Sequence, residues 1–273
     1  MPAYVSFLRT GIFKRFPTAA RCGGQYSLRI NKLSTRTDFV RIVEVGPLLY
    51  VTVSFYSRRN IRCSIEKSLS RASEMVRLAK KHHVRVRGYV SCIVGCPYEG
   101  KIDPVMVLKV SEKLADLGCY EISLGDTIGV ATPGDISRLL KSMFKILPAQ
   151  KIALHCHDTY GQALANILRG FDLGIRTFDS SIAGLGGCPY APGASGNVAT
   201  EDVVYMLNGM GVSTVSFLDL FVVLVTGWDT GVDFNKLIEV SQWLSTKVLN
   251  RPPVSKVAFA IYGSKCDNLL DRD

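Results

Sequence analysis

The first 37 residues contain no aspartate or glutamate, although they hold seven lysine or arginine side chains. They also lack the continuous apolar core that a secretory signal carries. A basic, hydroxyl-containing, acid-free leader is typical of a mitochondrial transit peptide, and a disordered basic tail is the alternative. We therefore expect residues 1–37 to direct the chain to the mitochondrial matrix.

This shortage of acidic residues accounts for most of the net charge of +10, because the remaining residues hold 26 basic and 23 acidic side chains. A second basic stretch, residues 58–87, lacks interleaved aromatic side chains and falls on a predicted helix. We interpret it as a solvated helix face. The charge pattern therefore predicts no nucleic-acid partner.

Other features are missing as well. No glycine-rich fingerprint for a dinucleotide or a P-loop follows any predicted strand, which disfavours nucleotide binding. The apolar stretch of residues 217–228 is too short for a membrane span and contains Asp219, so no membrane association is expected. The eight cysteines are irregularly spaced and indicate free thiols rather than a disulfide framework.

From residue 84 onward, short apolar stretches alternate with amphipathic ones. The predicted strands are residues 84–92, 120–124, 152–155 and 177–181, and the predicted helices are residues 104–117, 133–147, 160–173, 201–210 and 234–247. This alternation predicts an α/β fold of parallel βα units. Polar residues follow four consecutive strands, which favours the rim of a parallel barrel over an open doubly wound sheet.

The sequence KIALHCHDTY, residues 151–160, places two histidines at the end of an apolar strand. Side chains two residues apart in a strand point to the same side, so His155 and His157 share one space. Paired neutral imidazoles suit a metal ion, although two ligands alone do not make a site. Solvated histidines at a polar strand end are the alternative.

Several longer motifs, taken together, resemble the hydroxymethylglutaryl-CoA lyase family. They are VRGYVSC (86–92), GCPYEG (95–100), EISLGDTIG (121–129), HCHDTYGQALAN (155–166), AGLGGCPY (183–190) and GASGNVATED (193–202). The resemblance runs from about residue 60 to 212 and resumes from about 231 to 260, and residues 39–47 look like the first barrel strand of the family.

The resemblance implies a TIM (β/α)8-type barrel, incomplete in this chain, that acts as a homodimer. It implies a carbon–carbon lyase that uses Mg²⁺ or Mn²⁺ to cleave the CoA thioester 3-hydroxy-3-methylglutaryl-CoA into acetyl-CoA and acetoacetate. The implied metal ligands are His155, His157 and Asn197, the implied catalytic groups are Asp126, His155 and Cys188, and Tyr89 and Ser123 are implied to line the substrate pocket.

Each of these residues also has a structural interpretation. Asp126 suits a helix N-cap, and Cys188 suits a small buried apolar position. Asn197 follows a glycine and suits a turn. The ordered set on successive loops favours the functional interpretation.

The chain departs from the family pattern in two places. The family continues after Pro47 with an arginine and an aspartate, which polarise the thioester and bind the metal, but here Leu48 and Leu49 follow. We therefore divide the chain into a leader (1–37), a barrel domain (38–260) interrupted near 48–56 and 213–230, and a tail (261–273).

These departures predict little or no turnover. A catalytically defective subunit or a splice form is one alternative. A related isopropylmalate or homocitrate synthase, which would share the barrel and the metal pair, is another.

Overall fold

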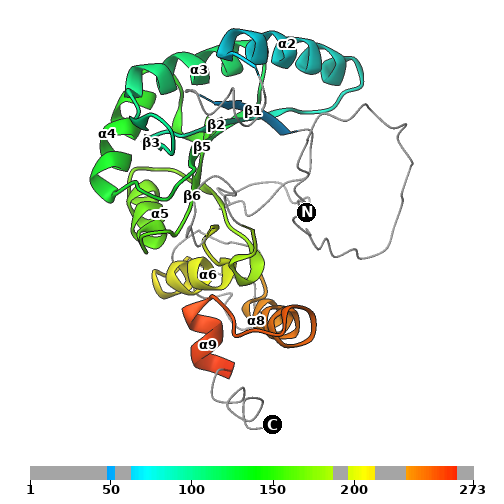
Figure 1. Ribbon diagram of the computed structural model, residues 1–273, viewed down its shortest axis with the longest axis vertical. Helices are drawn as coiled ribbons and strands as arrows, with labels where there is room; N and C mark the ends of the chain where they lie inside the picture. The colour runs from blue at the N-terminus through cyan, green and yellow to red at the C-terminus, as the bar shows by residue number, and fades with distance from the viewer. Residues whose placement is uncertain (1–47, 53–62, 187–195, 213–231, 263–273) are drawn as a thin grey trace.

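The computed structural model describes residues 48–52, 63–186, 196–212 and 232–262, and for residues 48–52 it describes the backbone alone. Five strands in the described part of the chain form one parallel sheet (Figure 1). They are β1 (Leu48–Thr52), β2 (Arg87–Ser91), β5 (Glu121–Asp126), β6 (Ile152–Cys156) and β7 (Thr177–Asp179). The strand order in the sheet, β1-β2-β5-β6-β7, is the order along the chain. A doubly wound sheet reverses its order at a switch point, so this sheet is of the barrel type.

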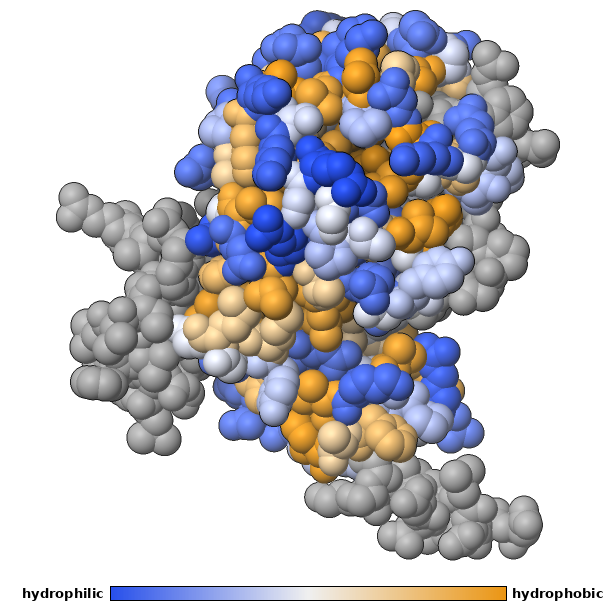
Figure 2. Space-filling model, turned by 90° about the vertical axis from the view of Figure 1, so that its left-hand side faces the viewer, coloured by the Kyte–Doolittle hydropathy of each residue, from blue (hydrophilic) through white to orange (hydrophobic). Residues whose placement is uncertain are grey.

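A helix follows each of the first four strands. These helices are α2 (Ile65–Lys81), α3 (Pro104–Leu117), α4 (Pro133–Met143) and α5 (Ala163–Asp172). They line the outer side of the curved sheet (Figure 1). Figure 2 views the molecule from this side, where hydrophilic side chains cover much of the surface and hydrophobic ones appear between them.

Helices α3 and α4 begin where the sequence predicts, because the residue before each of them carries a capping group. Asp103 accepts a hydrogen bond from the backbone of Val105 and caps α3, and Gly118 ends that helix with φ of 103°. Thr132 forms a reciprocal capping box with Asp135 at the start of α4.

Three predicted α-helices are shorter in the structure than in the sequence interpretation, and one of them, α8 (Phe234–Trp243), continues as the π-helix η3 (Leu244–Leu249). Helix α4 ends at Met143 instead of residue 147, in a turn that precedes Pro148. Helix α5 begins at Ala163 instead of residue 160, because Gly161 has φ of +67° and so lies outside the helical region.

The two faces of the sheet differ in polarity. Val90, Leu124, Leu154 and Phe178, one from each of four strands, are completely buried and belong to the core that the helices cover. Full burial of such a side chain contributes about 1.5–3 kcal/mol. The alternate residues of the same strands are mostly polar and point to the opposite face, which would line the inside of a closed barrel.

The remaining elements lie after β7 or in the connections between the strands. They are the short helices η1 (Ala149–Lys151) and η2 (Ile182–Gly184), helices α6 (Thr200–Gly209), α8 (Phe234–Trp243) and α9 (Lys256–Tyr262), the π-helix η3 (Leu244–Leu249), and the small hairpin of β3 (Gly95–Cys96) and β4 (Gly100–Lys101). Figure 1 shows α6, α8 and α9 together at one end of the molecule. Asp202 of α6 accepts hydrogen bonds from the Ser255 hydroxyl (2.6 Å) and the Val257 backbone (3.0 Å), which attaches α9 to α6.

The described residues therefore contain five strands of a barrel that has eight when complete. The predicted leader, residues 1–37, and the interruption at 213–230 lie outside the described residues. Within the described part of the chain, no helix has the length and hydropathy needed to cross a membrane.

Helix α5 packs so closely on the sheet that its glycine at position 170 has no room for a side chain. A Cβ atom there would lie 2.4 Å from Leu154 Cδ1 and 3.3 Å from Phe178 Cε1. We expect Gly170→Ala to lower the free energy of unfolding by about 1–3 kcal/mol through overpacking. Gly209→Ala in α6 is the matched control, because nothing lies within 4 Å of its Cβ position. Alanine there should be neutral or stabilising by up to about 1 kcal/mol. Urea unfolding measures the free energy of unfolding of both variants. An equal change in the two variants would contradict the overpacking at Gly170.

Candidate active site on the polar face of the sheet

The polar face of the sheet collects side chains from four neighbouring strands. The strand register pairs Tyr89 with Ser123, and His155 with Asp179. Side chains at paired positions of parallel strands lie on the same face. The polar residues brought together in this way are Arg87, Tyr89, Glu121, Ser123, His155, Thr177 and Asp179.

The two histidines that end β6 face each other. Their Nε2 atoms are 3.2 Å apart, and their ring centroids are 5.2 Å apart. His157 is buried, whereas His155 is partly exposed. Burial, together with the neighbouring His155, lowers the pKa of His157 to about 3. His157 is therefore neutral at physiological pH, which is the form of histidine that binds metal ions.

Asn197 lies beside this pair, as the resemblance implies. Its backbone forms an antiparallel bridge with His157. Its amide nitrogen donates to the Leu185 carbonyl oxygen at 2.9 Å, and an amide oxygen can accept a hydrogen bond or bind a cation. Gly186 permits this approach, because a Cβ on that residue would lie 2.7 Å from the Asn197 amide nitrogen.

These three side chains fit part of a metal site. Two nitrogen ligands of one cation, each about 2.0–2.2 Å from it, lie on the order of 3 Å from each other, and the histidine Nε2 atoms have this spacing. The Nδ1 atom of His157 is buried and makes no hydrogen bond of ordinary geometry within the described residues. The described residues hold no group of three or more His, Cys, Asp or Glu side chains placed to bind a metal, so the donor set here is two imidazoles and one amide.

A buried ion-pair cluster lies next to the histidines. Arg87 donates from Nε to Glu121 Oε2 at 2.7 Å and from Nη1 to Asp179 Oδ1 at 2.8 Å. Only 5% of the Arg87 side chain is exposed. Burial alone would lower its pKa, but the charge of Asp179 and the contacts with Tyr89 and Glu121 raise the pKa above its ordinary value. The guanidinium is therefore permanently charged.

This position corrects one sequence interpretation. We expected the basic stretch 58–87 to form a solvated face, and the last residue of that stretch is instead buried between two carboxylates. Helix α2 ends at Lys81, so Arg87 belongs to the next strand and not to the helix. The helical interpretation is wrong for Arg87, because successive side chains of a strand point to opposite faces and that of Arg87 points to the buried polar face.

Asp179 is the residue that connects the ion-pair cluster to the histidines. Its Oδ2 atom accepts a hydrogen bond from the Ser123 hydroxyl at 2.8 Å and lies 3.3 Å from His155 Nδ1. Burial raises the pKa of Asp179, but Arg87 and His155 outweigh that effect and lower the pKa well below its usual value. Sequence analysis missed Asp179 and Arg87, although each is a charged residue at an inward position of an apolar strand.

Tyr89 lies at the edge of the same cluster. Its hydroxyl accepts a hydrogen bond from Arg87 Nη1, and the guanidinium carbon lies 4.8 Å from the centre of its ring. Its ring meets the His155 ring edge-on, with the centroids 6.4 Å apart. The structure thus brings together Tyr89, Ser123, His155, His157 and Asn197 from the predicted set.

Asp126 occupies a different environment from the rest of the predicted set. It is completely buried, and its two carboxylate oxygens accept hydrogen bonds from the backbone of Val130 (3.1 Å) and Ala131 (3.0 Å). These contacts hold the loop between β5 and α4, whose N-cap is Thr132. Burial raises the pKa of Asp126 to about 6, against the backbone hydrogen bonds. Cys188, the remaining predicted residue, lies outside the described residues.

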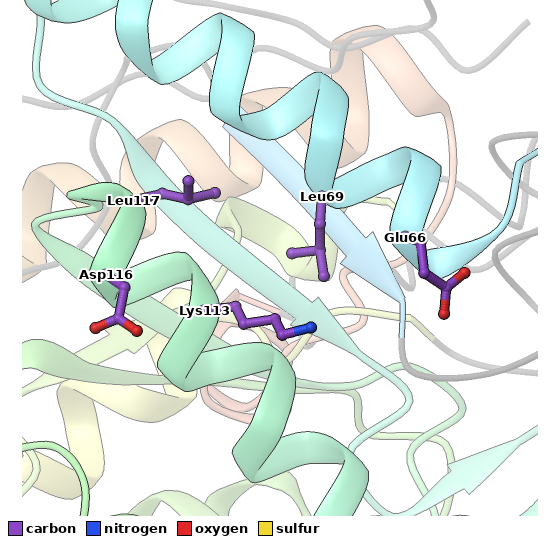
Figure 3. A pocket seen from close by; sticks show the side chains of 5 residues that line it. All are labelled: Glu66, Leu69, Lys113, Asp116 and Leu117. Atoms are coloured by element: carbon purple, nitrogen blue, oxygen red, sulfur yellow. The ribbon is translucent and has the colours of Figure 1, made fainter.

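A separate hollow lies on the outer side of the molecule. It has a volume of about 340 Å³ and lies between α2 and α3 (Figure 3). Its lining residues are Glu66, Leu69, Lys113, Asp116 and Leu117. It contains no histidine, cysteine or hydroxyl group, and we assign it no catalytic role.

The strand order and the polar strand ends define an α/β-barrel protein with its site at the carboxyl ends of parallel strands. A family model described as HMGL-like matches residues 35–244, and the chain belongs to this family.

Comparison with known proteins agrees with this assignment. The chain is 50% identical over 212 residues to a mouse protein named 3-hydroxy-3-methylglutaryl-CoA lyase, cytoplasmic, and the match covers 78% of this chain and 57% of the mouse protein. It is 54% identical over 206 residues to an Arabidopsis thaliana protein named hydroxymethylglutaryl-CoA lyase, mitochondrial, covering 76% of this chain and 40% of that protein. The chain thus spans about half the length of these curated relatives.

A solved structure supports the same conclusion. Hydroxymethylglutaryl-CoA lyase from Pseudomonas aeruginosa superposes with a TM-score of 0.71 at 46% identity, covering 80% of this chain and 67% of that one.

The raised pKa of Asp126 predicts a dependence of stability on pH. The folded-state pKa of about 6 exceeds the ordinary value of 3.8, so the unfolded state ionises first as the pH rises. The contribution of Asp126 is fully present below pH 4 and is lost as the pH passes 6. The loss amounts to about 3 kcal/mol at about 1.4 kcal/mol per pKa unit.

Asp126→Asn removes this titration. We expect the change in unfolding free energy from pH 4 to pH 7 to be more positive in the variant than in the wild type, by about 2–3 kcal/mol. Urea unfolding across this range measures it, and the opposing titration of His157 is common to both proteins. An unchanged pH profile would contradict the prediction.

Proposed function

We propose that this chain carries the site of a carbon–carbon lyase that cleaves 3-hydroxy-3-methylglutaryl-CoA to acetyl-CoA and acetoacetate. The observation that carries the proposal is the facing pair His155 and His157 with Asn197 beside it, at the carboxyl end of a barrel-type sheet. The family and the names of the relatives support the substrate.

The reaction breaks a carbon–carbon bond next to a tertiary hydroxyl group. The hydroxyl must lose its proton while electrons move toward the thioester carbonyl, and the resulting enolate must gain a proton. A divalent cation, which we propose to be Mg²⁺ or Mn²⁺, supplies the polarisation of the substrate oxygens, and His155, His157 and Asn197 are the residues that would hold it.

The proposed roles of the other residues follow from their positions. His155 is the group proposed to take the hydroxyl proton. Because its Nδ1 faces Asp179, Nε2 is the nitrogen that would either hold the cation or take the proton, and one lone pair cannot do both at once. Asp126, with its raised pKa, is the group proposed to share that proton. Tyr89 and Ser123 line the substrate space, and Cys188 is proposed as the acid that protonates the enolate.

We propose that turnover in this chain is low because the arginine and aspartate expected after Pro47 are absent. The two residues at that point, Leu48 and Leu49, begin strand β1, where Leu48 pairs with Arg87. They therefore lie at the amino end of the strand, whereas the histidines lie at the carboxyl end of β6. Substituting them in place would not restore the site, so the longer missing segment is required.

An assay of lyase activity tests the function directly. The 273-residue chain and a version with the missing segment restored between Pro47 and Ser57 are compared with 3-hydroxy-3-methylglutaryl-CoA and Mg²⁺. We expect acetoacetate from the restored version, and a rate lower by about 10²–10³ or more in the chain itself, since one lost electrostatic donor has that effect. Equal rates would contradict the proposed loss. Condensation of a 2-oxo acid with acetyl-CoA, without cleavage, would identify a synthase instead.

Metal binding provides an independent test. We expect the purified chain to bind Mn²⁺ weakly, because the donor set has lost a carboxylate, and His157→Ala to abolish the binding that remains. The matched control is His82→Ala, since His82 is exposed at the end of α2. Electron paramagnetic resonance of free Mn²⁺ measures how much Mn²⁺ the chain and each of the two variants bind. Retained binding in the His157 variant would show that the pair is not a ligand set.

We also propose the mitochondrial matrix as the location of this chain. The acid-free composition of residues 1–37 supports it, and the relatives include mitochondrial and cytoplasmic proteins. By the family resemblance we propose that it forms a homodimer.

A further inference from the structure

The carboxylate of Asp179 receives contacts from three different strands. Arg87 Nη1 lies 2.8 Å from Oδ1, the Ser123 hydroxyl lies 2.8 Å from Oδ2, and His155 Nδ1 lies 3.3 Å from Oδ2. The sheet register makes His155 and Asp179 direct neighbours on adjacent strands. The strand pairing itself therefore fixes this contact.

The chemistry of the partners decides where the protons lie. Arg87 only donates hydrogen bonds, and its buried charge requires an anion beside it. A carboxylate only accepts hydrogen bonds, so a neutral His155 must present a proton on Nδ1 to Asp179. The lone pair of His155 then lies on Nε2, the atom that faces His157.

We infer that Asp179, held by Arg87, is a positioning residue that fixes His155 in the tautomer with Nδ1 protonated and Nε2 open to the cation. This inference rests on the proposed function of the site and adds a residue to it. Carboxylates that accept from the far nitrogen of a metal-binding histidine orient the ring and raise ligand basicity, and their loss lowers metal affinity by about 10- to 100-fold.

Glu121 separates this positioning role from a purely structural one. It is the second carboxylate on Arg87, at 2.7 Å, and it is also buried, but its other contact is the Thr177 hydroxyl at 3.0 Å and not a histidine. Substitution of either acid with its amide removes one charge from the cluster. Of these two acids, only Asp179 forms a hydrogen bond with His155.

The wild-type chain gives the first measurement. The chain has four histidines, so the imidazole nitrogens can be resolved by long-range ¹H–¹⁵N correlation spectroscopy at pH 8 without metal, with His155→Gln to assign the signal. We expect Nδ1 of His155 to be protonated and Nε2 to be unprotonated. Protonation of Nε2 instead would overturn the inference, and this measurement requires neither catalysis nor metal binding.

Asp179→Asn should reverse the tautomer. Because Arg87 only donates, the amide oxygen of the asparagine turns toward it, and the amide NH₂ turns toward His155. Nδ1 of His155 must then accept, so its proton moves to Nε2. We expect Glu121→Gln to leave the wild-type tautomer in place, because the amide oxygen can still accept from Arg87.

Mn²⁺ affinity is the second readout. We expect a decrease of about 10- to 100-fold in Asp179→Asn and little change in Glu121→Gln. Equal decreases in the two variants, or an unchanged tautomer in Asp179→Asn, would show that Asp179 only supports the fold. If the wild-type chain binds no Mn²⁺, the proposed metal site fails, while the wild-type tautomer still decides the inference about Asp179.

Discussion

One buried guanidinium connects three of the five strands. Arg87 of β2 pairs with Glu121 of β5 and with Asp179 of β7, and all three side chains are almost inaccessible to water. Removing one partner from such a cluster leaves an unpaired buried charge and costs about 3–5 kcal/mol. The position of His155 depends on this cluster, because Asp179 contacts its ring. The arrangement of the site and the cohesion of the polar face therefore have the same physical origin.

The two buried aspartates differ in pKa because their side chains point to opposite faces of the sheet. Asp179 lies on the polar face, where the Arg87 guanidinium and the hydrogen bonds from Ser123 and His155 keep its carboxylate ionised. Asp126 lies at the end of β5 and points to the opposite face from Ser123, and its carboxylate accepts hydrogen bonds from backbone N–H groups. Burial then outweighs those bonds and raises its pKa. One of these acids stays charged, and the other can hold a proton near neutral pH.

The segment that we propose to be missing would account for the incompleteness of the proposed site. The described sheet has five strands in barrel order, and β1 follows the Pro47 position at which the family pattern breaks. His157 and Asn197 still come together, because β6 pairs with β7 and the backbone of Asn197 forms a bridge with His157. By the proposed function, the carboxylate ligand and the arginine would come from the absent part, so we expect the remaining residues to bind a cation without providing the full electrostatic stabilisation of a transition state.

The sequence alone determined the alternation of strands and helices, the capped helix starts at Asp103 and Thr132, and the histidine pair, because each depends on local periodicity or on neighbours in the chain. Its motifs also indicated the family and located the break after Pro47. The tertiary structure decided that the sheet follows chain order, that Arg87 is buried, and that Asp179 contacts His155. Those contacts join residues 24 to 92 positions apart. Such pairings depend on which strands become neighbours in the sheet and in what register, so residues this far apart in the chain meet only when the sheet forms.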